Sequence, residues 1–204
     1  MSIHTHPSFG CVFFLRGGSL KYDNITDNDR EMIALQLGRE ARGLLGVAVR
    51  CKYGYPQVIV NRPVSIDIAD INVFPTLFWL TCPYLRKVVA RLESDGIIAR
   101  FEERLQEDEE FAKQVEANHD AYAKARLDLI PREVQARLEE DYPERFRVIA
   151  HSGIGGSRSR EGVKCLHMHL ADYLVQKENV IGEEVVKLLD CSLHCDSGSC
   201  EKEL

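Results

Sequence analysis

The chain has 204 residues, of which 45% are hydrophobic and 28% are charged, and its formal net charge is −6. This length suits one domain with a single core. The acidic balance is untypical of nucleic-acid-binding proteins, and no apolar run approaches the roughly 20 residues that a membrane helix needs. We therefore expect a cytoplasmic protein that has no membrane partner and does not bind nucleic acid.

Composition divides the chain into three regions. Residues 1–24 mix histidine, proline and glycine, and we expect them to form a poorly ordered N-terminal extension. Residues 25–190 carry helix and strand patterns and are expected to form a single α+β domain. Residues 191–204 are a polar tail that contains cysteines.

The first helix is predicted to begin at Thr26, because Thr26 and Asp29 have the spacing of a capping box, and Gly38 is expected to end it. Apolar runs between turn residues then predict strands. These strands are expected at residues 44–50, 57–61 and 76–81, with an edge strand within 64–72. The first two would form a hairpin with Cys51 at its tip, in a small antiparallel sheet of three or four strands.

Helical periodicity predicts the remaining elements. Pro83 opens a helix that Gly96 ends, and a long acidic helix follows from Ile97 until Pro131 breaks it. Residues 132–150 would return beside it, and two more helices are predicted at 164–175 and 183–189. The fold class is therefore α+β, with the small sheet packed against helices and a long acidic helical hairpin protruding from it.

Three short segments carry the candidate chemistry: CKYGYP around Cys51, LTCPYL around Cys82, and VKCLHMHL around Cys165. The cysteine count is seven, an odd number, so in a reducing compartment thiols or metal ligands are expected rather than disulfides. Cys82 would lie at a helix N-terminus, where the helix dipole favours a thiolate, although a small buried residue fits there equally well.

The two histidines after Cys165 leave two arrangements open. If the helix already includes Cys165, then Cys165 and His169 share one face at the i, i+4 spacing. If the helix begins only after Cys165, His167 can turn toward the cysteine instead. Either histidine is therefore a candidate partner of this thiol.

The leading hypothesis is a metal site with Cys51, Cys82, Cys165 and either His167 or His169 as ligands. Zinc suits such mixed nitrogen and sulfur donors best, and an iron–sulfur cluster is the second choice. Four ligands would make a closed structural site. Three would leave a position for metal-activated water, and hence for hydrolysis.

Two other classes of function stay open. In a metal-free thiol enzyme, Cys82 or Cys165 would be the nucleophile and His167 or His169 the base, acting on an anionic substrate. In a non-catalytic interaction module, the acidic hairpin would dock a protein partner and the cysteines would belong to the core.

A glycine-rich loop precedes Cys165 and is a candidate anion site. Its glycines allow a backbone nest, its basic residues supply charge, and a helix N-terminus follows. The residues concerned are Gly153, Gly155, Gly156, Arg158 and Lys164. A small anionic ligand would fit there, although the spacing of a Walker loop is absent and a solvated loop is the alternative.

The tail raises the metal question again, with Cys191, His194, Cys195 and Cys200 at spacings that a metal ion could use. A disordered tail with exposed thiols is the favoured alternative.

At these residues the chain resembles a bacterial family grouped as domain of unknown function 501. The matching stretches include LQLGREARGLLGVAVRCKYGYP, FPTLFWLTCPYL, RLESDGIIARFEERL and GIGGSRSREGVKCLHMHLADYL, within residues 33–189. The resemblance implies no established activity. It does imply that Cys51, Cys82, the GIGG glycines and the Cys165–His167 unit are motif positions, with His169 a less firm one. Lys52 departs from the pattern, in which proline often follows the first cysteine.

Overall fold

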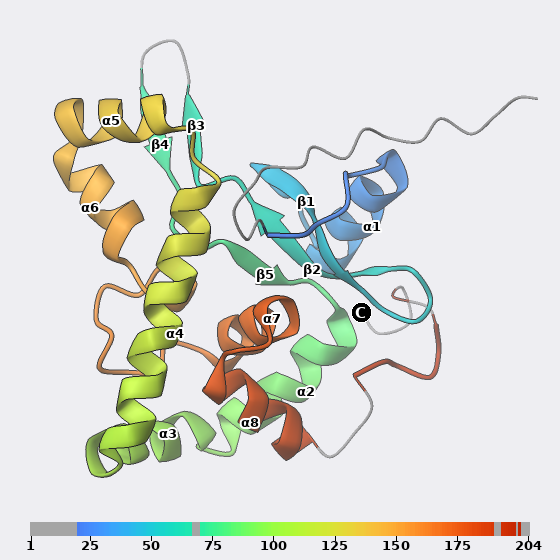
Figure 1. The fold of residues 1–204 in the computed structure, drawn as a ribbon. Coiled ribbons are helices and arrows are strands. Elements are labelled where there is room, and N and C mark those ends of the chain that lie inside the picture. The colour runs from blue at the N-terminus through green and yellow to red at the C-terminus, as the bar shows by residue number, and fades with distance from the viewer. Residues whose placement is uncertain (1–19, 67–69, 190–192, 199, 201–204) are drawn as a thin grey trace, which may run out of the picture.

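A three-stranded antiparallel sheet in the order β1–β2–β5 lies at the centre of the fold (Figure 1). The predicted edge strand is not part of it, because Val64–Ile66 and Ile71–Val73 pair with each other as a separate two-stranded sheet. The strands are β1 (Leu44–Arg50), β2 (Pro56–Asn61), β3 (Val64–Ile66), β4 (Ile71–Val73) and β5 (Phe78–Leu80). Together with the helices they confirm the predicted α+β class.

The computed structural model describes residues 20–66, 70–189, 193–198 and 200. Most of the predicted N-terminal extension lies outside these residues, as does Cys191. Within them are eight α-helices: α1 (Asp27–Leu37), α2 (Pro83–Ser94), α3 (Ile97–Glu107), α4 (Glu109–Asp128), α5 (Arg132–Asp141), α6 (Pro143–His151), α7 (Leu166–Gln176) and α8 (Val180–Leu189). None of these helices is both long enough and apolar enough to cross a membrane.

Strand β2 is buried along its whole length, because both faces of the sheet are covered. Val58 and Val60 face the main core, to which α2, α4, α7 and α8 contribute. Ile59 points to the opposite face and packs with Ile33 of α1 and with Val47. This alternation explains why residues 57–61 form a nearly continuous apolar run, as strands covered on both faces do.

The predicted long acidic helix is divided in two at Asp108. The side chain of Asp108 accepts a hydrogen bond from the Phe111 N–H at 3.0 Å and so caps α4. The prediction of one continuous helix was wrong because an aspartate before two glutamates is itself a helix start signal. After α5, which leads away from the end of α4, helix α6 returns and packs against α4, so the return arm of the predicted hairpin is made by α6 (Figure 1).

The capping box at the start of α1 is confirmed and is extended by an ion pair. Asp29 exchanges hydrogen bonds with Thr26, and its carboxylate also accepts two from Arg50, at 2.6 and 3.0 Å. These bonds, chiefly those from Arg50, lower the pKa of Asp29 to about 2. The pair joins α1 to the end of β1.

Arg126 of α4 is fully buried, and its guanidinium donates to three backbone carbonyls. The acceptors are Ile149 at 2.6 Å, Pro75 at 2.8 Å and Ser152 at 2.6 Å. Burial lowers the pKa of Arg126 to about 10, so the group stays charged at neutral pH. One side chain thereby fixes the end of α6 and the segment that leads into β5.

The glycine-rich loop after α6 packs against the same helix α4. The Ile154 N–H donates to Nδ1 of the buried His119 at 3.0 Å. A Cβ atom on Gly153 would lie only 2.5 Å from that Nδ1, so only glycine fits at this position without movement. Arg160 pairs with Glu116 and Asp120, also on α4, and so holds the far end of the loop.

We predict that Asp29→Asn lowers the free energy of unfolding at pH 7 by about 1–3 kcal/mol, because two charge-assisted bonds from Arg50 are weakened. The pKa of Asp29 is lowered on folding, so its contribution is present above pH 3.8 and lost as the pH falls toward 2. Denaturant unfolding at several pH values should show the two proteins converging over that range. Asp27→Asn, an exposed neighbour in the same turn, is the control, and equal losses for both variants would contradict the prediction.

We also predict that Gly153→Ala destabilises the protein by about 1–3 kcal/mol, since the new methyl group displaces a buried imidazole. Gly162→Ala in the same loop is the matched control. There the added Cβ meets only the flexible end of the Glu102 side chain, at 3.1 Å, so stability should stay near that of wild type. Thermal unfolding of both variants checks the difference, and equal melting temperatures would refute it.

Candidate metal centre

The start of α7 decides which histidine faces Cys165. Cys165 has an extended backbone and lies just before the helix, which begins at Leu166. This is the second of the two arrangements considered from the sequence, and it turns His167 toward the cysteine, with Nδ1 at 3.8 Å from Cys165 Sγ. His169 instead lies on the buried face of α7, and its Nδ1 pairs with the side-chain oxygen of Asn179 at 3.2 Å.

Glu93, near the end of α2, completes the group. Its Oε1 accepts from the Leu166 N–H at 2.7 Å and lies 3.1 Å from His167 Nδ1. The ligand atoms of Glu93, Cys165 and His167 all lie within 4.8 Å of one another, so the three could hold a metal ion. Glu93 was not among the candidate ligands predicted from the sequence, where its only signal is its place in the RLESDG stretch of the family resemblance.

The two nitrogens of His167 have different neighbours. Nε2 lies 3.0 Å from the carbonyl oxygen of Arg86, and because a carbonyl can only accept, Nε2 must carry a proton. Nδ1 is the nitrogen that faces both Cys165 and Glu93. A histidine that donates one N–H to a backbone carbonyl has its ring orientation fixed and presents the other nitrogen for coordination.

The surroundings of His167 also favour its charged form. Burial lowers the pKa of this imidazole, but the hydrogen bonds with Cys165 and with the Arg86 carbonyl, and the charge of Glu93, outweigh burial and raise the pKa to about 9. The ring therefore lies where positive charge is stabilised, and a metal ion at Nδ1 would place positive charge in the same position.

Cys82 and Cys51 lie outside this group. Cys82 precedes the first turn of α2, and Glu93 lies near the last turn. At a rise of 1.5 Å per residue, these two residues are about 16 Å apart along the helix axis. Burial raises the pKa of the Cys82 thiol to about 11, against the lowering by nearby backbone N–H groups. Its thiol is thus held protonated, which is opposite to the effect expected from a helix N-terminus. Cys51 lies in the turn between β1 and β2.

Most amides of the predicted anion loop already have acceptors inside the protein. The N–H groups of Gly153, Gly156 and Ser157 bond to carbonyls of the loop, and that of Ile154 bonds to His119. The Lys164 ammonium donates to the Gly155 carbonyl at 2.8 Å. Anion binding by Gly153, Gly155, Gly156, Arg158 and Lys164 stays a prediction, and it would require several of these bonds to open.

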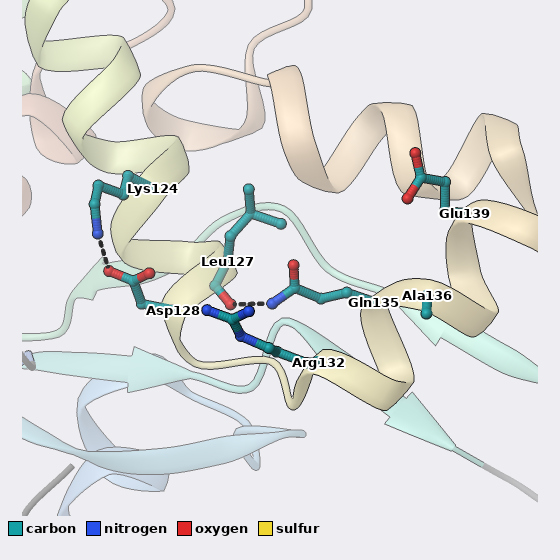
Figure 2. Close-up of a pocket in the computed structure, with 7 residues that line it drawn as sticks. All are labelled: Lys124, Leu127, Asp128, Arg132, Gln135, Ala136 and Glu139. Carbon is teal, nitrogen blue, oxygen red and sulfur yellow. Dashed lines mark hydrogen bonds and ion pairs between the residues drawn. The ribbon is translucent and has the colours of Figure 1, made fainter. Parts of the chain in front are cut away.

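A shallow surface hollow lies at the junction of α4 and α5 (Figure 2). Some of its polar groups already pair with one another, Lys124 with Asp128 and the Gln135 side chain with the Leu127 carbonyl. In Figure 1 this junction lies far from α2 and α7, so the hollow adds nothing to the metal centre. The candidate site is therefore defined by its ligand group.

Comparison with known proteins identifies one family. No curated protein and no solved structure matches the chain. The model of a family described as protein of unknown function (DUF501) matches residues 47–187, well over half of the sequence, and this stretch includes the whole metal centre. The chain therefore belongs to the DUF501 family.

Proposed function

We propose that this DUF501 protein binds a zinc ion through Glu93, Cys165 and His167. The donors are one carboxylate, one thiolate and one imidazole, a mixed set that suits zinc. An iron–sulfur cluster is held mainly by cysteine thiolates, and the group supplies only one of these.

The observation that carries the proposal is the convergence of two potential ligands on one nitrogen of His167. In a thiol–histidine–carboxylate relay, the nucleophile and the acid contact different ring nitrogens. Here Cys165 and Glu93 both face Nδ1, while Nε2 is held by a backbone carbonyl. Three donor atoms near one another, with the second nitrogen held from outside, support a metal centre, because a metal-binding histidine usually donates its other N–H to a backbone carbonyl or carboxylate.

Three protein ligands leave one position of a tetrahedral zinc ion open, which distinguishes catalytic from structural zinc sites. The side chains of His167 and Glu93 are 20% and 24% exposed, so water or a small ligand can reach this position. The proposal therefore favours an open centre at which a substrate or water binds, rather than a closed structural site.

A metal-free thiol enzyme is the second candidate, with Cys165 as nucleophile and His167 as base. The 3.8 Å contact between Cys165 Sγ and His167 Nδ1 favours it. The two functions differ in their response to zinc. In a metal centre the ion protects Cys165 from alkylation, whereas in a thiol enzyme Cys165 reacts fastest of all the cysteines whether or not zinc is present.

The test compares zinc content and affinity for wild type, Glu93→Gln, Cys165→Ser and His167→Gln, using the full chain and a competing chelator. Each substitution should remove one bound zinc ion or weaken its binding at least about tenfold, because a direct ligand matters no less than a supporting residue. His151→Gln, which replaces an exposed histidine at the end of α6, is the control and should bind zinc as wild type does.

Circular dichroism establishes that each variant is folded before its zinc content is compared. Unchanged zinc content and affinity in all three folded variants would refute the metal centre. Rapid alkylation of Cys165 in both the presence and the absence of zinc would point instead to the thiol enzyme.

A further inference from the structure

His119 is a buried histidine that the proposed metal centre does not use. It lies on α4 with only 1% of its surface exposed, and its Nδ1 accepts a hydrogen bond from the Ile154 N–H at 3.0 Å. Ile154 begins a single turn of 3₁₀-helix (Ile154–Gly156) in the glycine-rich loop, which runs from the end of α6 past α4 to the start of α7 (Figure 1). One ring nitrogen thus fastens this loop to α4.

This hydrogen bond fixes the protonation state of the ring. A backbone N–H can only donate, so Nδ1 must offer a lone pair, and the single proton of the neutral imidazole lies on Nε2. Nε2 is buried, and among the described residues it has no hydrogen-bond partner. A second proton on the ring would therefore take away the acceptor of the Ile154 N–H and leave two N–H groups facing each other.

The ring is packed on both sides. Gly153 lies so close to the imidazole that a Cβ atom on it would be 2.5 Å from Nδ1. The ring of His169, on α7, lies edge to face with that of His119, with the ring centroids 6.2 Å apart. Since the ring has little room to turn, we expect the loop rather than the ring to move when Nδ1 is protonated.

Arg160 provides a second attachment of the loop to the same helix. Its guanidinium pairs with Glu116 and with Asp120, in both cases at 2.6 Å. Glu116 lies about one helical turn before His119, and Asp120 directly follows it, so a positive charge on His119 would compete with Arg160 for both carboxylates. Both attachments of the loop therefore weaken with the same proton.

The charges around His119 agree with this geometry. Burial lowers the pKa of His119 below its usual value of 6.5, and the charge of Arg160 acts in the same direction. The carboxylates of Glu116 and Asp120 and the backbone of Arg160 oppose this lowering without reversing it. His119 is therefore neutral at pH 7, where the bond from the loop is intact.

Helix α7 contributes two further buried titratable groups, His169 and Asp172. Burial raises the pKa of Asp172 to about 6, so this carboxyl titrates in the same range of pH. A test of His119 must therefore separate its effect from that of Asp172.

We infer that His119 is a pH-sensitive latch whose protonation releases the glycine-rich loop from α4. The pKa of His119 is lowered on folding, so the stabilisation from its neutral ring is complete above pH 6.5 and is lost as the pH falls below that value. The inference does not rest on the proposed function, because in the described part of the chain His119 bonds to the loop and to none of the three proposed ligands.

The first experiment follows the exchange of the Ile154 amide hydrogen by NMR in wild-type protein, at about pH 7 and about pH 5.5. After correction for the intrinsic exchange rate, protection should fall by up to about tenfold, because the released loop takes up one proton. Amides of β2 in the same sample should keep their protection, which distinguishes local release from unfolding. Unchanged protection of Ile154, or an equal loss in β2, would overturn the latch.

Two variants assign the effect to one side chain. His119→Asn places an oxygen acceptor near the position of Nδ1 but cannot be protonated, so Ile154 should be equally protected at both pH values. His151→Asn removes an exposed histidine next to the same loop and is the matched control, which should keep the pH dependence of wild type. A dependence that persists in His119→Asn would refute the inference and point to Asp172.

A second measurement needs no variant. The ring nitrogens of His119 are titrated by nitrogen NMR in wild-type protein. Nδ1 should carry no proton near pH 7 and should gain one with a midpoint below 6.5, over the same range in which the Ile154 amide signal changes. A proton on Nδ1 at neutral pH, or a charged ring with Ile154 still protected, would contradict the latch.

Discussion

The structure around the candidate centre depends on one buried charge. Within the part of the chain that the structure describes, the guanidinium of Arg126 has no carboxylate partner and is instead satisfied by three backbone carbonyls from separate segments. Taking a charge out of water is costly unless its hydrogen bonds are satisfied, so those three carbonyls are held in place together. The acceptor at Ser152 is the last residue before the glycine-rich loop, and that loop leads directly to Cys165. The position of the thiol is therefore set from the interior of the protein.

Helix α2 has a comparable role on the other side of the centre, because its length separates Cys82 from Glu93. Its first turn follows Cys82, and its last turn supplies Glu93 to the start of α7. A rigid helix keeps these two ends apart, so Cys82 and the Cys165 motif lie in different parts of the structure.

Local signals in the sequence were sufficient for much of the fold. The cap at Thr26, the hairpin around Cys51 and the helix start at Pro83 each depend on neighbouring residues, and the structure has all three. The candidate site depended on contacts between distant segments. The choice between His167 and His169 turned on where α7 begins, by a single residue. Glu93 lies more than seventy residues from its partners in sequence, so no spacing rule could identify it.

Glu93 also limits how this protein can change in evolution. The same carboxylate oxygen that faces His167 accepts the Leu166 N–H, and negative charge at a helix N-terminus is stabilising. Replacement by histidine or cysteine would keep a metal donor but remove the cap of α7. Replacement by glutamine would keep an acceptor for the cap but remove the charge. Few residues can replace one that both caps α7 and offers a metal donor. Substitutions at position 93 should therefore be rarer among relatives than either role alone would make them.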